Sequence, residues 1–109
     1  MKITLPFAVL TAALCTVSAY NTAHAQDTMS EGKKLFTESA VPACSICHAM
    51  KQAGAVGEVG PSLDELKPDA ARVEKALRNG IGQMPAFKTL SEAQIKLLGA
   101  YVASATAGK

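Results

Sequence analysis

The strongest constraint in this 109-residue chain is a run of five residues, Cys44-Ser45-Ile46-Cys47-His48. Two thiols separated by two residues and followed directly by an imidazole form the C-x-x-C-H pattern of covalent haem attachment. Each thiol can add to one vinyl group of a porphyrin, and the histidine then lies beneath the ring, where a neutral imidazole nitrogen can bind iron. The motif therefore predicts one haem c, held through Cys44 and Cys47, with His48 as an iron ligand.

Other uses of these residues fit less well. A thioredoxin-like redox pair requires a strand–helix–strand context, and no strand pattern surrounds Cys44. A structural zinc site needs four ligands, commonly drawn from Cys and His, and the chain after Ala25 contains only three such residues, Cys44, Cys47 and His48. A plain disulfide between Cys44 and Cys47 would leave His48 without a purpose. Haem attachment accounts for all three side chains.

The N-terminal segment has the pattern of a secretory signal peptide. A charge at Lys2 precedes an apolar run over residues 3–17, and Ala23-His24-Ala25 has the small residues of a cleavage site. The alternative is an uncleaved membrane anchor, but the run is interrupted by Pro6 and is short for a span of about 20 residues. We expect residues 1–25 to be removed after Ala25, residues 26–109 to form the mature domain, and the protein to be periplasmic.

Cleavage would leave 84 of the 109 residues. Cys15 and His24 would be lost, so Cys44 and Cys47 become the only cysteines and His48 the only histidine. A single domain of this size has a marginal apolar core, which a covalently held porphyrin would complete. With Lys2 removed, the mature chain has ten basic and nine acidic residues. This balance lacks the excess of positive charge typical of nucleic-acid-binding proteins. We expect no membrane span after cleavage.

Helix signals recur along the mature chain. Thr28 with Glu31, and Ser91 with Gln94, have the spacing of capping boxes, each followed by apolar residues at helical intervals. Between them, Pro68 suits a first helical turn and Gly80 suits a stop. We expect helices over residues 28–39, 68–79 and 91–104, and a short helical turn from the motif to about residue 51. On the middle helix we expect four charged side chains to cover the outside: Arg72, Glu74, Lys75 and Arg78. The prediction is an all-α fold of about four short helices around one haem.

The second iron ligand must be sought among methionines, because the mature chain has no second histidine. Met50 is tied to the same side of the haem as His48, and Met29 at the start of the first helix is better explained as a packing residue. Met84 lies far enough along the chain to wrap around the porphyrin, in a loop stiffened by Pro85. We predict His48 and Met84 as the iron ligands.

Thioether ligation raises the reduction potential relative to a haem with two histidine ligands. It also fills the sixth position on iron, so that no site is open to oxygen or peroxide. The chain is therefore predicted to carry one electron at a time and not to be an enzyme. A haem sensor or peroxidase would need an exchangeable iron site.

As a whole, residues 26–105 resemble a class I cytochrome c, with the attachment motif near the mature N-terminus and a methionine ligand toward the C-terminus. Cytochromes c′, which are four-helix bundles, place the motif near the C-terminus instead. The resemblance implies that Gly32 and Phe36 of the first helix pack against Tyr101 of the last. It also implies that the carbonyl of Pro61, within Gly60-Pro61-Ser62-Leu63, accepts a hydrogen bond from His48 and orients it.

Two segments are similar to those of a narrower group, the small periplasmic cytochromes that accept electrons from bacterial molybdenum sulfite dehydrogenases. They are residues 57–63, Gly-Glu-Val-Gly-Pro-Ser-Leu, and residues 79–85, Asn-Gly-Ile-Gly-Gln-Met-Pro. This likeness implies a sulfite dehydrogenase as electron donor, with an acceptor such as a cytochrome oxidase. The alternative is a tightly bound haem subunit of a periplasmic oxidoreductase complex, and size and charge do not decide between the two.

A carrier of this kind should dock briefly to its partners through a small apolar patch ringed by charge. We expect Lys51 and Lys88 in that ring. We expect the patch around the exposed haem edge to include Ala43, Ser45, Ile46, Gly82, Gln83, Ala86 and Phe87.

Overall fold

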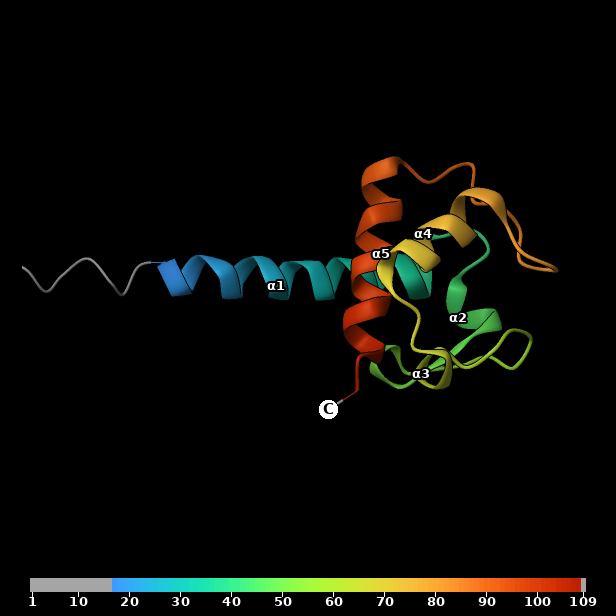
Figure 1. The fold of residues 1–109 in the computed structure, drawn as a ribbon, viewed down its shortest axis with the longest axis horizontal. Coiled ribbons are helices and arrows are strands. Elements are labelled where there is room, and N and C mark those ends of the chain that lie inside the picture. Colours follow the sequence, from blue (N-terminus) through green and yellow to red (C-terminus); the bar gives the residue numbers. More distant parts are fainter. Residues whose placement is uncertain (1–16, 109) are drawn as a thin grey trace, which may run out of the picture.

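The computed structural model describes residues 17–108, so Cys15 and nearly all of the apolar run lie outside the described residues. These residues form a mostly helical domain with one small antiparallel sheet (Figure 1). The elements in chain order are α1 (Val17–Lys34), the π-helical η1 (Leu35–Ser39), α2 (Cys44–Cys47), β1 (Ala49–Met50), the 3₁₀ turn η2 (Lys51–Ala53), β2 (Ala55–Val56), α3 (Leu63–Leu66), α4 (Ala70–Asn79) and α5 (Glu92–Thr106).

Helix α5 is the element around which the others pack. It contacts α4 along its length, the C-terminal part of α1, and α3 (Figure 1). The first turns of α1 project away from the domain, and residues 23–27 are exposed. The core is built mainly from α5 and η1, and its most deeply buried large side chains are Tyr101, Phe36, Met50 and Leu98.

The crossing of α1 and α5 requires a glycine. A Cβ atom at Gly32 would lie 2.4 Å from Tyr101 Cβ, closer than any side chain tolerates, so the two backbones approach to a distance that only glycine allows. The Phe36 and Tyr101 rings pack edge to face, with centroids 6.0 Å apart and planes at 63°. The packing of Gly32 and Phe36 against Tyr101 that the resemblance implied is confirmed.

Tyr101 also joins α5 to the middle of the chain. Its ring is fully buried, and its hydroxyl donates a hydrogen bond to Gln52 Oε1 in η2. Burial raises the pKa of Tyr101 to about 12, so the phenol stays protonated and remains a donor.

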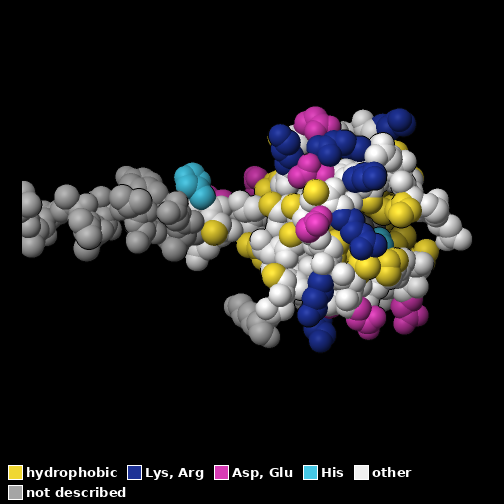
Figure 2. All heavy atoms as spheres, viewed as in Figure 1, with side chains coloured by type: hydrophobic (Ala, Val, Ile, Leu, Met, Phe, Trp, Pro, Cys, Tyr) yellow, Lys and Arg dark blue, Asp and Glu magenta, His cyan; other side chains and the backbone are white. Residues whose placement is uncertain are grey.

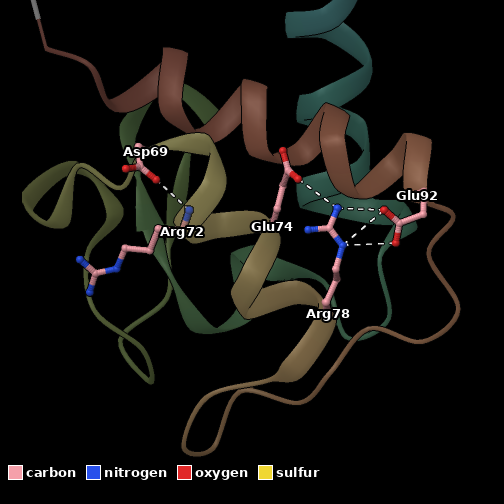
Figure 3. A network of polar contacts seen from close by, with 5 residues as sticks. All are labelled: Asp69, Arg72, Glu74, Arg78 and Glu92. Carbon is pink, nitrogen blue, oxygen red and sulfur yellow. Dashed lines mark hydrogen bonds and ion pairs between the residues drawn. The ribbon is translucent and has the colours of Figure 1, made fainter.

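Caps define the ends of α4 and α5. The predicted capping box of α5 is confirmed: Gln94 N donates to Ser91 Oγ over 3.2 Å, and Ser91 N donates to Gln94 Oε1 over 2.9 Å. Helix α4 starts after Asp69, whose Oδ1 accepts from Arg72 N at 2.7 Å (Figure 3). It stops at Gly80, where φ is +70°.

An ion-pair cluster joins α4 to the start of α5. Arg78 Nη2 lies 3.0 Å from Glu74 Oε2 and 2.8 Å from Glu92 Oε2 (Figure 3). The hydrogen bond from Arg78 lowers the pKa of Glu92, and Arg78 itself is held more firmly protonated. The stabilisation from Glu92 is therefore present above the ordinary glutamate pKa of about 4.3 and is lost as the pH falls through the lowered value.

The predicted start of the first helix and the predicted end of the helical turn after the motif were wrong. The first helix does not begin at Thr28, because Thr28 Oγ1 bonds back to the His24 carbonyl at 2.9 Å and the helix continues through both residues. The helical turn from the motif ends at Cys47, and a hairpin follows with Ala49 opposite Val56, so the fold is mostly helical but not all-α.

The number and limits of the later helices also differ. Residues 17–108 contain five α-helices, where about four were predicted. The additional helix is α3. The middle helix begins two residues after Pro68, and α5 runs two residues beyond Ser104. Between Val17 and Gly108, none of the helices combines the length and the apolar character that crossing a bilayer demands.

Replacing Gly32 with alanine should destabilise the domain although alanine favours helices. The added methyl group would force α1 away from Tyr101, and overpacking of this kind costs about 1–3 kcal/mol. Denaturant unfolding of the haem-loaded protein, followed by far-UV CD, measures the effect. Ser30→Ala on the same helix is the control because Ser30 is exposed. Equal stability of Gly32→Ala and wild type would show that the crossing is looser than described.

Candidate functional site

A cavity of about 670 Å³ opens between the segment that carries the cysteine motif and helix α4. Its size is within the range of small-molecule and cofactor sites. Figure 2 shows hydrophobic side chains gathered around a hollow on this face of the domain, with Lys and Arg side chains beside them. The lining comes from five parts of the chain: Phe36 of η1, residues within 42–48, 59–63 and 66–87, and the middle of α5.

The two cysteines lie at the first and last residues of α2, and both line the cavity as free, half-buried thiols. One helical turn separates them, which places both sulfur-bearing side chains toward the same wall. Burial raises the pKa of the Cys44 thiol to about 11, so this thiol is protonated near neutral pH. A thiol held protonated is a poor metal ligand, because metals bind the thiolate.

His48 leaves α2 in extended conformation and lines the same cavity. Its Nδ1 lies 2.8 Å from the carbonyl oxygen of Pro61. A carbonyl can only accept, so Nδ1 carries the proton and Nε2 is the nitrogen with a free lone pair. The hydrogen bond that the resemblance implied is present, and it leaves His48 able to bind a metal through Nε2.

Gly60 holds the imidazole in this orientation from the other side. A Cβ atom at Gly60 would lie 2.5 Å from His48 Cε1, and Gly60 N donates to the Cys47 carbonyl over 2.7 Å. The backbone of residues 60–61 therefore contacts both the ring and the motif, which any larger side chain would prevent.

The three methionines of the predicted mature chain occupy different surroundings. Met84 lines the cavity, whereas Met50 is fully buried in the core and Met29 packs against the core from α1. Met84 is held by a tight turn in which its N–H donates to Ile81 O over 2.9 Å and Ile81 N–H donates to Met84 O over 3.0 Å. Met84 is thus the one methionine placed among the described lining residues.

Of the residues assigned to the docking patch, Ala43, Gln83 and Phe87 line the cavity and Ile46 is exposed. Phe87 is 6% exposed and belongs to the core, so it contributes little surface. Lys51 and Lys88 are exposed but do not line the cavity. Ile81 and Val59, each 67% exposed, lie at the cavity and were missed, although their place next to the Gly-Pro and Met-Pro segments could have indicated it.

Of the four charged residues of α4 predicted to cover the outside, Arg72, Lys75 and Arg78 are exposed and Glu74 is half-buried. Arg72 and Lys75 line the cavity, whereas Glu74 and Arg78 do not. Arg72 and Lys75 are three residues apart and therefore share one face of the helix. Only the packing of α4 against the motif segment shows that this face meets the cavity.

These residues fit a covalently attached haem. The lining supplies two free thiols, an imidazole with its Nε2 lone pair available, a thioether, and otherwise mostly apolar walls. Within residues 17–108, no three His, Cys, Asp or Glu side chains gather into a metal-binding group, so a zinc-type cluster finds no support in this part of the chain.

Comparison with known proteins supports this interpretation. Residues 27–102 match the family described as cytochrome c oxidase, cbb3-type, subunit III. No curated protein sequence matches the chain significantly. Among solved structures, the c-type cytochrome SorU from Sinorhizobium meliloti is 47% identical, with a TM-score of 0.72 over 74% of this chain and 93% of SorU. The chain therefore belongs to the cytochrome c family, in the group described as cytochrome c oxidase, cbb3-type, subunit III, and is a monohaem c-type cytochrome.

Proposed function

We propose that this cytochrome is a periplasmic one-electron carrier whose haem iron is ligated by His48 and Met84 and which takes electrons from a sulfite dehydrogenase. The observation that carries the proposal is that one cavity presents both motif thiols, the imidazole of His48 and the thioether of Met84. Electron transfer is the general role of the family. The ligands, the location and the donor are our proposals.

Each residue has a distinct task in this proposal. Cys44 and Cys47 would hold the haem through thioether bonds, formed when each S–H adds across a vinyl group with no atom lost. The carbonyl oxygen of Pro61 accepts a hydrogen bond from Nδ1–H of His48, which fixes the tautomer and makes Nε2 a better ligand. Haem supplies an iron centre that gains and loses one electron. The apolar walls exclude water, and the fixed turn at Met84 limits rearrangement between the two charge states.

The proposed function requires Met84 to be the second iron ligand beside His48. Met84→Ala should abolish the weak long-wavelength sulfur-to-iron band of the ferric protein, lower the reduction potential, and allow carbon monoxide to bind the ferrous form. Visible spectroscopy and a redox titration measure these changes. Met29→Ala is the control, since Met29 packs on α1 away from the cavity. Persistence of the band in Met84→Ala would show that another group is the ligand.

The choice of donor rests on two segments, residues 57–63 and 79–85, whose likeness to sulfite dehydrogenase acceptors was noted from the sequence. Both contribute to the cavity wall, at Val59, Gly60 and Pro61 in the first and at Ile81, Gln83 and Met84 in the second. They therefore shape the surface from which an electron would leave or enter the haem. A partner that recognises this chain would contact the exposed side chains of these segments.

The oxidised haem-loaded protein, mixed with periplasmic extract of its source, tests the donor. Addition of sulfite should produce the reduced haem bands within the mixing time, and omission of either extract or sulfite should not. Dithionite must reduce the same sample in every case. Reduction by dithionite but not by extract with sulfite would rule out a sulfite-oxidising donor while leaving the carrier intact.

A fixed haem subunit is the second candidate function, and the family description favours it because that description names an oxidase subunit. Size-exclusion chromatography of native extract separates the two. Elution of the haem at the mass of the free domain supports the carrier, and elution only with larger subunits supports a fixed relay.

We also propose export, with cleavage after Ala25. Residues 23–27 are exposed on the part of α1 that projects from the domain, so removal of the preceding residues takes nothing described from the core. N-terminal sequencing of the protein from periplasm should give Gln26 first. A start at Met1, or recovery only from the membrane fraction, would favour the uncleaved anchor.

A further inference from the structure

The charged residues that line the cavity are all of one sign. Arg72 and Lys75 are the only charged side chains in its lining, and no Asp or Glu is among the described residues there. Both lie on α4, three residues apart, so they share one face of the helix. The Lys and Arg side chains beside the hydrophobic hollow in Figure 2 show this combination of cations and apolar surface.

Neither cation is neutralised within the described part of the chain. No hydrogen bond or ion pair of the Arg72 or Lys75 side chain occurs among residues 17–108, and only the backbone N–H of Arg72 is used, by Asp69. The acid nearest in sequence, Glu74, is paired with Arg78. Figure 3 shows the Arg72 guanidinium well apart from the cluster of Glu74, Arg78 and Glu92.

We propose that Arg72 and Lys75 bind the carboxylate groups of the haem. The inference rests on the proposed function, because it requires the haem to occupy the cavity. A haem is apolar except for two propionate carboxylates, and a carboxylate brought against apolar walls costs free energy unless a cation or hydrogen bonds compensate it. The planar guanidinium of Arg72 can donate two parallel hydrogen bonds to one carboxylate, and the ammonium of Lys75 acts as a point charge.

This pairing has consequences for the redox centre. Cations beside the carboxylates offset their negative charge, which would otherwise favour the ferric over the ferrous state. Arg72 and Lys75 are thus positioning and tuning residues that act through the carboxylates and do not touch the iron. The apolar stems of both side chains can lie along the cavity wall while their charged ends reach the opening.

The same cations could instead bind carboxylates of a redox partner, and the experiment separates the two sources. The variants are Arg72→Gln, Lys75→Gln and the double substitution. Arg72→Lys keeps the positive charge but loses the two parallel N–H donors of the guanidinium. Lys96→Gln is the matched control, because Lys96 is exposed on α5 and does not line the cavity. Far-UV CD and the ferrous absorption spectrum verify folding and haem content of each.

Two readouts are taken on the isolated protein: the reduction potential, and the proton NMR shifts of the propionate methylene groups. We expect Arg72→Gln and Lys75→Gln each to lower the potential and move the propionate signals, the double variant to lower it further, and Arg72→Lys to retain part of the wild-type value. Lys96→Gln should leave the propionate signals in place.

Propionate signals and potential unchanged relative to Lys96→Gln in every variant would overturn the proposal. If, in addition, the variants lost the salt dependence of electron uptake from the donor, the cations would be assigned to a partner's carboxylates. Absence of covalent haem in the wild-type protein would refute the proposed function itself, a result visible before any variant is compared.

Discussion

The hydrogen bond from His48 Nδ1 to the carbonyl oxygen of Pro61 is the contact on which the site depends. It connects the cysteine motif to a segment 13 residues later, and it determines which imidazole nitrogen faces the cavity. Gly60 makes this contact possible, because its missing side chain leaves room for the ring. Without this pair, two thiols and a histidine would remain adjacent in the chain but the imidazole would be free to rotate.

The packing of the helices builds the cavity walls around this hydrogen bond. The close crossing of α1 and α5 at Gly32 and Tyr101 places η1, with Phe36, against the cavity. Helix α4 packs along α5 and forms the opposite wall, and Met84 follows it in a turn closed by two backbone hydrogen bonds. The distances between donor groups are thus set by helix packing, which is rigid on the scale that ligand geometry requires.

The four charged side chains of α4 that were considered from the sequence form two groups. Glu74 and Arg78 turn toward the start of α5, where Arg78 also pairs with Glu92 and fastens the two helices together. Arg72 and Lys75 turn toward the cavity and remain unpaired among the described residues. A surface pair such as Arg78 with Glu92 adds little stability alone.

Local chemistry was readable from the sequence, because it depends on residues close together in the chain. The C-x-x-C-H motif, the capping box at Ser91 and Gln94, and the stop at Gly80 each follow from spacing alone. Choosing Met84 from three methionines needed only the length of chain between it and His48, and the structure places it in the cavity wall, although its bond to iron stays a prediction. What could not be read were features set by contacts between distant segments.

Thr28 had the sequence of a cap, yet its hydroxyl bonds to the His24 carbonyl because the helix extends back to Val17. The hairpin of residues 49–56 reverses the chain and brings Gly60 back to the motif. There Gly60 N donates to the Cys47 carbonyl, a contact between segments that the sequence pattern does not reveal. Only the tertiary structure decided which face of α4 meets the cavity, since a row of four charges gives no direction until the helix is packed against α5.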